Sequence, residues 1–318
     1  MPERFACVSI DVDSLSSIYK GLGCTRPGGY TFIEFRTGLE NFSRFFERFN
    51  IRATLFMVGN DFKHAPNLGH IRALHQAGHE IANHTMSHPQ GFRWLSAEEK
   101  ESELSAMSDI CRETVGESPI GFRSPGWNVD DASLPILQKL GYVYDSSVFP
   151  TFLMPLMKFA HWRSMSAQPA PVRTTMGQWN YMTAPIRPYY TSPHSLAQKG
   201  QGGLIEFPIS VTRFLRIPFF ATLLLFSGDA FYAHLYRAMR SQGLPIHFQM
   251  HLSDFMDYNL PELADQMPRG GSGTYLPQAL STSLERKLAL FEKTIARIAA
   301  DYQFVTLKEW AARMPPQP

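Results

Sequence analysis

Two histidines stand four residues apart in the segment Asn83-His84-Thr85-Met86-Ser87-His88-Pro89, which a proline closes. On one helical turn, or side by side on a tight loop, this spacing lets each imidazole give one nitrogen to the same cation. A carboxylate from another strand would complete a set of two histidines and one acid, with positions left open for water and substrate. We expect Asp13 to supply it. The alternative is that His84 and His88 are ordinary polar loop residues.

Asp11 and Asp13 lie two residues apart, so on an extended strand they face the same side. Two neighbouring carboxylates repel each other unless positive charge lies beside them. A metal on one and an arginine on the other would remove the repulsion and divide the roles. The metal-bound acid would be a ligand, and the free acid would be a base that takes a proton from metal-bound water. In the alternative, one of the two acids caps a turn at Ser14.

Short apolar runs rich in β-branched residues alternate with amphipathic stretches along the chain. Strands are predicted over residues 5–12, 52–59, 79–84, 120–125, 142–147, 204–210, 246–251 and 304–307. Helices are predicted over residues 37–50, 66–77, 96–115, 131–140, 229–242 and 277–300. Two helix starts carry a capping box, in which a hydroxyl and a carboxylate satisfy free N–H groups: Ser96 with Glu99, and Thr306 with Glu309.

This alternation predicts an α/β fold with a parallel sheet, either open or closed into a barrel. Residues 151–203 break the pattern, because they hold six prolines and seven aromatic residues without a clear period. We therefore expect one domain over residues 1–318, with a long irregular excursion at about 151–203 that covers one face.

Polar residues fall where the predicted strands end. Asp11 and Asp13 close the first strand, His84 and His88 follow the third, Arg123 follows the fourth, Asp145 lies on the fifth and His251 ends the seventh. Functional groups of parallel α/β folds gather at the carboxyl ends of the strands. The sequence therefore predicts one site at that end of the sheet.

The composition excludes some classes of protein. The chain has 318 residues, of which 18% are charged and 13% aromatic, and a formal net charge of +2 without a Lys/Arg run, which argues against nucleic-acid binding. Its three cysteines, Cys7, Cys24 and Cys111, form no CxxC pair, which argues against a thiolate zinc site and favours a reducing compartment. The N-terminal residues lack a secretory signal, and the apolar run Ile217–Gly228 is too short to span a bilayer. We expect a cytoplasmic protein, with contact to a membrane surface left open.

Five segments resemble, in order, the five motifs of the polysaccharide deacetylases, the NodB-homology group or carbohydrate esterase family 4: SIDVDS, NHTMSHP, GFRSPGWN, YDSSVFP and HFQMHLSDF. The resemblance covers about residues 5–310. It implies a distorted (β/α) barrel of seven or eight mostly parallel strands that hydrolyses the N-acyl group of amino sugars. It also implies a divalent metal, usually zinc, with cobalt, nickel or manganese as alternatives.

The resemblance assigns roles position by position. The metal ligands would be Asp13, His84 and His88. Asp11 would be the catalytic base, Arg123 would hold and orient Asp11, and His251 would be the general acid that protonates the leaving amine. The residue-level alternatives are a surface arginine at 123 and a buried structural histidine at 251.

Two further residues are candidates for substrate binding. Trp127 would either stack on a sugar face or pack in the protein. Asp145 would either orient His251 or line the groove.

The first motif separates its two acids by Val12, whereas they are adjacent in the commonest pattern of the family. This Asp-x-Asp spacing resembles the branch with lipid-linked amino-sugar deformylases and deacetylases, and also some peptidoglycan and small-amide hydrolases. The apolar stretches 152–159 and 214–226, with basic residues beside or within them, suit a sugar carried on a polyprenyl phosphate at the membrane face. The alternatives are that these stretches are covered core, or that the protein deacetylates polysaccharide or peptidoglycan, cleaves small amides, or is an inactive sugar-binding relative.

Overall fold

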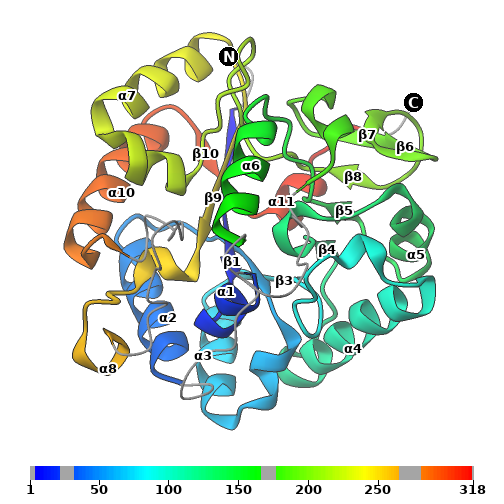
Figure 1. Ribbon diagram of the computed structural model, residues 1–318, viewed down its shortest axis with the longest axis horizontal. Coiled ribbons are helices and arrows are strands. Elements are labelled where there is room, and N and C mark those ends of the chain that lie inside the picture. Colours follow the sequence, from blue (N-terminus) through cyan, green and yellow to red (C-terminus); the bar gives the residue numbers. More distant parts are fainter. Residues whose placement is uncertain (1–3, 22–31, 166–176, 265–280, 317–318) are drawn as a thin grey trace.

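The computed structural model describes residues 4–21, 32–165, 177–264 and 281–316 (Figure 1). Seven parallel strands form the curled sheet at its centre, in the spatial order β9 (Ile246–His251), β1 (Phe5–Val12), β2 (Thr54–Met57), β3 (Glu80–Asn83), β4 (Gly121–Phe122), β5 (Tyr144–Asp145) and β8 (Ile205–Glu206). An eighth parallel strand, β10 (Gln303–Phe304), pairs with the start of β1. The predicted distorted barrel of mostly parallel strands is confirmed.

The chain beyond β8 narrows the gap between the two ends of the curled sheet. The Ser210 amide donates to the carbonyl of His247 on β9 at 3.4 Å, and the His247 amide donates to Ser210 Oγ at 2.7 Å. The sheet thus approaches closure without a continuous ladder between β8 and β9.

The two longest strands of the structure, β1 and β9, have the predicted bounds, and the other predicted strands are shorter than predicted. Strands β1 and β9 are buried on both faces for nearly their whole length. Strands β4, β5 and β8 have only two residues each, because the chain leaves the ladder early to enter the loops above the sheet.

Helices surround the sheet (Figure 1). They are α1 (Leu15–Gly21), α2 (Phe32–Glu47), α3 (Ala65–Gln76), α4 (Ala97–Val115), α5 (Leu134–Lys139), α6 (Met154–Met165), α7 (Ala221–Ser241), α8 (Pro261–Ala264), α10 (Leu284–Ala299) and α11 (Leu307–Ala311). Both predicted capping boxes are present, at the starts of α4 and α11. Helix α7 begins earlier than predicted and has a kink at Gly228. The prediction missed its first turns because they are apolar on nearly all sides and show no helical period in the sequence.

The predicted irregular excursion is wrong in part. Residues 151–203 contain helix α6 and an antiparallel hairpin of β6 (Tyr189–Ser192) and β7 (Ser195–Lys199); residues 166–176 lie outside the described part. The helix was missed because its apolar side chains do not share one face: Met154 is buried, whereas Leu156 is exposed.

Apolar side chains from the sheet and from helices α2, α3, α7 and α10 form the largest core cluster. Cys7 and Cys111 are buried and unpaired, and Cys24 lies outside the described residues. No helix in the described part of the chain has the length and apolar character needed to cross a membrane.

Candidate metal centre

Asp13, His84 and His88 meet at the carboxyl end of the sheet. Asp13 follows β1, and both histidines lie on the loop after β3. Asp13 Oδ1 lies 3.5 Å from His84 Nε2 and 3.2 Å from His88 Nε2, and one ligand atom from each residue fits within 4.8 Å of the others. Two ligand atoms bound at about 2.1 Å to one tetrahedral ion lie about 3.4 Å apart. The three atoms therefore have the spacing of one coordination sphere.

The chemistry of the three residues fits a divalent cation. Asp13 Oδ1 is buried and has no hydrogen-bond partner among the described residues, although it faces two imidazole nitrogens. His84 Nδ1 lies 2.7 Å from the carbonyl oxygen of Arg123, so a proton on Nδ1 leaves the Nε2 lone pair facing Asp13. A borderline-soft ion such as zinc prefers this set of donors.

The electrostatics of the triad also favour added positive charge. Burial opposes the charged form of Asp13, but the two histidines outweigh burial and hold the pKa of this carboxyl well below its usual range. Burial likewise opposes the charged form of His84, but Asp13 and Asp11 outweigh it and raise the pKa of the imidazole. The two shifts show that Asp13 and the histidines interact strongly, and that Asp11 and Asp13 favour positive charge at His84.

The loop that carries the two histidines is held in an unusual backbone conformation. Thr85 (φ +69°) and His88 (φ +53°) lie in the left-handed region, where a non-glycine residue costs about 1–3 kcal/mol. Side chains fix the loop: Asn83 Oδ1 accepts from the Thr85 amide at 2.7 Å, and Thr85 Oγ1 accepts from the His88 amide at 3.0 Å. Glu103 on α4 accepts from both the amide and the hydroxyl of Ser87. The conformation turns both rings toward Asp13.

Arg123 is completely buried and pairs with Asp11, which excludes the surface-arginine alternative. Its Nη1 lies 2.5 Å from Asp11 Oδ1. Its Nε donates to the carbonyl of Ser146 at 2.9 Å, and its Nη2 donates to the hydroxyls of Ser146 and Ser9 at 2.8 and 3.0 Å. The guanidinium also lies 4.0 Å from the ring centroid of Phe56. Asp11 is thus fixed beside the triad by an arginine that cannot turn away.

Comparison with known proteins finds a family model that matches part of the chain. Residues 29–144, which include His84, His88 and Arg123, match the model of the family described as polysaccharide deacetylase. Over this segment, about a third of its length, the chain is similar to the polysaccharide deacetylase family. Asp13 lies outside the matched segment, and the fold brings it to the two histidines.

Named relatives of the family cover parts of this chain. A peptidoglycan deacetylase of Helicobacter pylori is 24% identical over 111 residues, which is 35% of this chain and 37% of the relative. Chitin deacetylase 1 of Cryptococcus neoformans is 33% identical over 92 residues, 29% of this chain and 19% of the relative. The matches span less than half the length of these curated relatives.

One solved structure shares the fold along the whole chain. A Mycobacterium smegmatis protein, provisionally named a polysaccharide deacetylase, superposes with a TM-score of 0.59 at 18% identity, over 100% of this chain and 96% of that one. This likeness supports the barrel-like fold.

His251 lies beside Asp11, and a residue that the sequence interpretation missed joins them. Strand β9 pairs with β1 so that His251 is opposite Asp11. Gln249 is buried, and its Nε2 lies 2.9 Å from Asp11 Oδ2 and 3.1 Å from His251 Nε2. Residues two apart on a strand share a face, so the spacing of Gln249 and His251 in the sequence could have identified Gln249 as a site residue. Gln249 therefore bridges the predicted base and the predicted acid.

His247 lies deeper on the same strand and supports Arg123. Its Nε2 is 2.7 Å from Ser9 Oγ and 3.1 Å from Arg123 Nη2, and its Nδ1 is 3.3 Å from the Pro208 carbonyl. Burial, and then the charge of Arg123, hold the pKa of His247 well below its ordinary value. A neutral imidazole with an acceptor nitrogen facing the guanidinium fits both contacts.

Asp145 shows neither of the two predicted roles. Its carboxylate is buried, accepts from the Ser147 hydroxyl at 2.7 Å and faces Glu206 on β8. Burial raises the pKa of both carboxyls, and the nearby Asp145 raises that of Glu206 further. The pair is a buried structural feature. The contact of Glu206 with Asp145 could not be predicted from the sequence, because the two residues lie 61 positions apart on different strands.

Trp127 packs in the protein. It is 7% exposed, its ring centroid lies 4.8 Å from that of Phe149, and its backbone has φ +55°. The structure therefore favours the packing alternative over stacking on a sugar.

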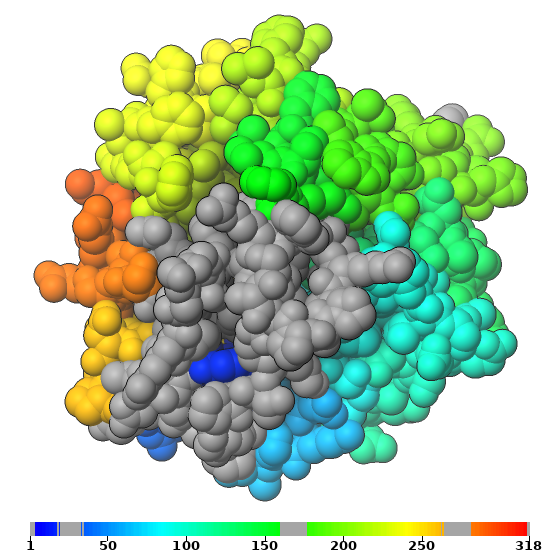
Figure 2. All heavy atoms as spheres, in the orientation of Figure 1, coloured from blue at the N-terminus to red at the C-terminus, as the bar shows by residue number. Residues whose placement is uncertain are grey.

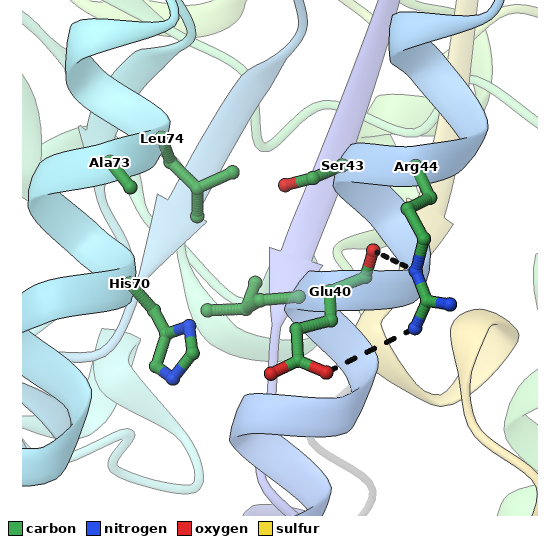
Figure 3. A pocket seen from close by; sticks show the side chains of 7 residues that line it. Glu40, Ser43, Arg44, His70, Ala73 and Leu74 are labelled. Carbon is green, nitrogen blue, oxygen red and sulfur yellow. Dashed lines mark hydrogen bonds and ion pairs between the residues drawn. The ribbon is translucent and has the colours of Figure 1, made fainter.

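A surface pocket lies apart from these residues, between α2 and α3 (Figure 3). Glu40 and Arg44 line one wall as an exposed ion pair 4.0 Å apart, and His70 lines the other. None of the predicted site residues lines it.

Proposed function

We propose that the protein is a metal-dependent hydrolase that removes an N-acyl group, acetyl or formyl, from an amino sugar. The observation that carries this proposal is the Asp13–His84–His88 triad, whose ligand atoms lie within 4.8 Å of one another beside Asp11. A divalent cation held by these residues would supply Lewis acidity toward the acyl carbonyl and the attacking water. We infer zinc from the donor set, with cobalt, nickel and manganese as the ions to compare.

The chain's own residues supply the proton transfers. Asp11 accepts the proton of the attacking water, and the ion pair with Arg123 keeps its carboxylate directed toward the triad. His251, on the partner strand, donates a proton to the nitrogen of the leaving amine, because an amine leaves poorly without one. Gln249 holds these two groups at a fixed separation through one amide nitrogen.

The substrate is proposed to be an amino sugar on a polyprenyl-phosphate carrier at the cytoplasmic face of a membrane. The support is the Asp-x-Asp spacing of the first motif and exposed apolar side chains on two segments, namely Phe152, Leu153 and Leu156, and Phe214 and Leu215. The second candidate is a deacetylase of polysaccharide or peptidoglycan, which the names of the chitin and peptidoglycan deacetylases among the relatives favour.

An assay of acid release tests both the proposed reaction and the proposed substrate. Protein loaded separately with zinc, cobalt, nickel or manganese is incubated with N-acetyl and N-formyl amino sugars, as free sugars, as oligosaccharides and on a polyprenyl phosphate. Released acetate and formate are measured. We expect metal-dependent release, with the lipid-linked sugar as the best substrate.

Two variants make the assay specific. Asp11→Asn should abolish turnover and retain the metal. Asp130→Asn, which changes an ion pair with Lys100, should retain both turnover and the metal. A protein that binds no metal and releases no acid from any of these sugars would overturn the reaction. Preferential release from oligosaccharides would overturn only the lipid-linked substrate.

A further inference from the structure

Exposed apolar side chains gather on two segments that lie at the same edge of the molecule. Phe152, Leu153 and Leu156 come from the start of α6 and the residue pair before it, and Phe214 and Leu215 come from the loop after β8. Leu156, Phe214 and Leu215 are 64%, 73% and 67% exposed. Single exposed apolar residues are common on proteins, but a group of five marks an interaction surface. We call these five residues the apolar ridge.

Direct contacts join the two segments into one surface. The Arg216 guanidinium lies 5.2 Å from the ring centroid of Phe152 and donates to the carbonyl of Pro150. The Thr151 hydroxyl donates to the Arg216 carbonyl at 2.9 Å. Figure 2 shows α6 (green) at the surface, beside the start of α7 (yellow-green to yellow). The ridge is therefore continuous between α6 and the loop.

The loop presents its apolar residues at the tip of a tight turn. Val211 bridges Pro218 in antiparallel fashion, and the Thr212 amide donates to the Ile217 carbonyl at 2.9 Å. Phe214 and Leu215 lie at the end of this turn and project into solvent. A turn closed in this way holds two large apolar side chains in water, where they are available for contact with another surface.

The charges around the ridge have one sign. Residues 146–165 and 207–228 contain no aspartate or glutamate, and their basic residues include Lys158, Arg213 and Arg216. The Arg213 guanidinium lies 5.6 Å from the Phe214 ring centroid, and Lys158 Nζ lies 5.3 Å from that of Trp179. Apolar residues that enter an acyl layer, with cations beside them at headgroup level, match an anionic lipid surface.

The ridge lies at the same end of the barrel as the metal centre. Its segments follow β5 and β8, and the triad follows β1 and β3, all at the carboxyl ends of parallel strands. We propose that the apolar ridge docks the protein on an anionic lipid bilayer, with the carboxyl ends of the strands facing the membrane. This proposal deepens the proposed function. It rests on that function only in one respect, that the substrate is presented at the membrane.

Vesicle sedimentation of the full chain tests the docking. Vesicles of phosphatidylglycerol and phosphatidylcholine should bind the protein at low salt, and binding should fall as salt screens the basic residues. The Phe214→Ser/Leu215→Ser variant should lower the vesicle partition coefficient about tenfold or more, since two apolar anchors are lost. Arg213→Gln should lower it several-fold and weaken its salt dependence.

A matched control lies at the opposite end of the strands. Val143 is 38% exposed and comes just before β5, so Val143→Ser removes an exposed apolar residue outside the ridge and should leave vesicle binding unchanged. Thermal unfolding and zinc content of the ridge variant check that it is folded.

Three outcomes would overturn the docking. They are equal binding to pure phosphatidylcholine vesicles, ridge variants that bind like the unmodified protein, and a dimer in light scattering that the ridge variant converts to a monomer. The last would assign the ridge to a second copy of the chain. Sedimentation requires no turnover, and sugar hydrolysis by the unmodified protein requires no vesicles, so the failure of one proposal is distinguishable from the failure of the other.

Discussion

The two ends of strand β3 carry buried ionisable groups in opposite situations. At the amino end, Glu80 accepts hydrogen bonds from the Thr54 hydroxyl, the Tyr144 hydroxyl and the Lys308 amide, at 2.7, 2.7 and 2.9 Å. At the carboxyl end, His84 faces Asp13, whose Oδ1 has no hydrogen-bond donor in the described part of the chain. Buried polar groups nearly always have a hydrogen-bond partner, either in the protein or in ordered water. The difference indicates that the Glu80 network is complete and structural, whereas Asp13 Oδ1 is available to an ion.

The strongest test of this comparison is Asp13→Asn. We expect zinc affinity to fall by more than the roughly 10–100-fold that loss of an outer-shell partner costs, because a direct ligand and its charge are lost. The metal-free variant should also unfold more easily than the unmodified metal-free protein, because the interactions of Asp13 with His84 and His88 are weakened. Metal analysis and denaturant titration measure the two effects. Full zinc content in this variant would contradict the assignment of the triad.

Arg123→Met should give the next largest effect. It leaves Asp11 buried without its cation, and breaking a buried pair by removing one partner costs about 3–5 kcal/mol of unfolding free energy. Arg112→Met is the matched control, because its ion pair with Asp109 is exposed on both sides and its loss should cost less than about 1 kcal/mol. Equal midpoints of urea unfolding for the two variants would show that the Arg123 network is dispensable.

Glu80→Gln tests the complete network at the other end of β3. In the variant, an NH₂ group that can only donate replaces one carboxylate oxygen that accepts hydrogen bonds. We therefore expect the free energy of unfolding to fall by about 1–3 kcal/mol. Zinc content should not change. A variant that keeps its stability but loses zinc would reverse the comparison between the two ends.

The smallest expected effect is the pH dependence that His79 contributes. Its Nδ1 accepts from the Ala53 amide at 3.0 Å, and burial, with a smaller contribution from Arg52, lowers the pKa of the imidazole from 6.5 to about 4. The unfolded chain then binds the proton more readily than the folded one, so stability is lost as pH falls from about 6.5 toward 4. Between pH 6.5 and 5.5 this amounts to about 1 kcal/mol.

Two variants isolate this pH effect in denaturant titrations. His79→Asn should flatten the dependence, and His70→Asn, at the outer pocket, should leave it unchanged. A slope that survives in His79→Asn would assign the dependence to another group.

The sequence predicts the parts of this molecule that depend on local pattern. Strands β1 and β9 were predicted with their bounds because long buried runs are unambiguous, and the strand-end rule placed Asp13, His84 and His88 in one site. Gln249 and the Asp145–Glu206 pair were not predicted, because they depend on which strands are neighbours and in which register. Helix α6 was missed because its apolar residues show no single face.

Val12 is fully buried in the main core, between two acids that face the other way. It anchors the backbone from behind, so Asp11 and Asp13 cannot move independently of each other. With a rise of about 3.3 Å per residue, one strand fixes their backbones roughly 6.6 Å apart. The proposed ion ligand and the proposed proton acceptor are thus coupled through a hydrophobic side chain, and a repacking of the core beneath Val12 would displace both at once.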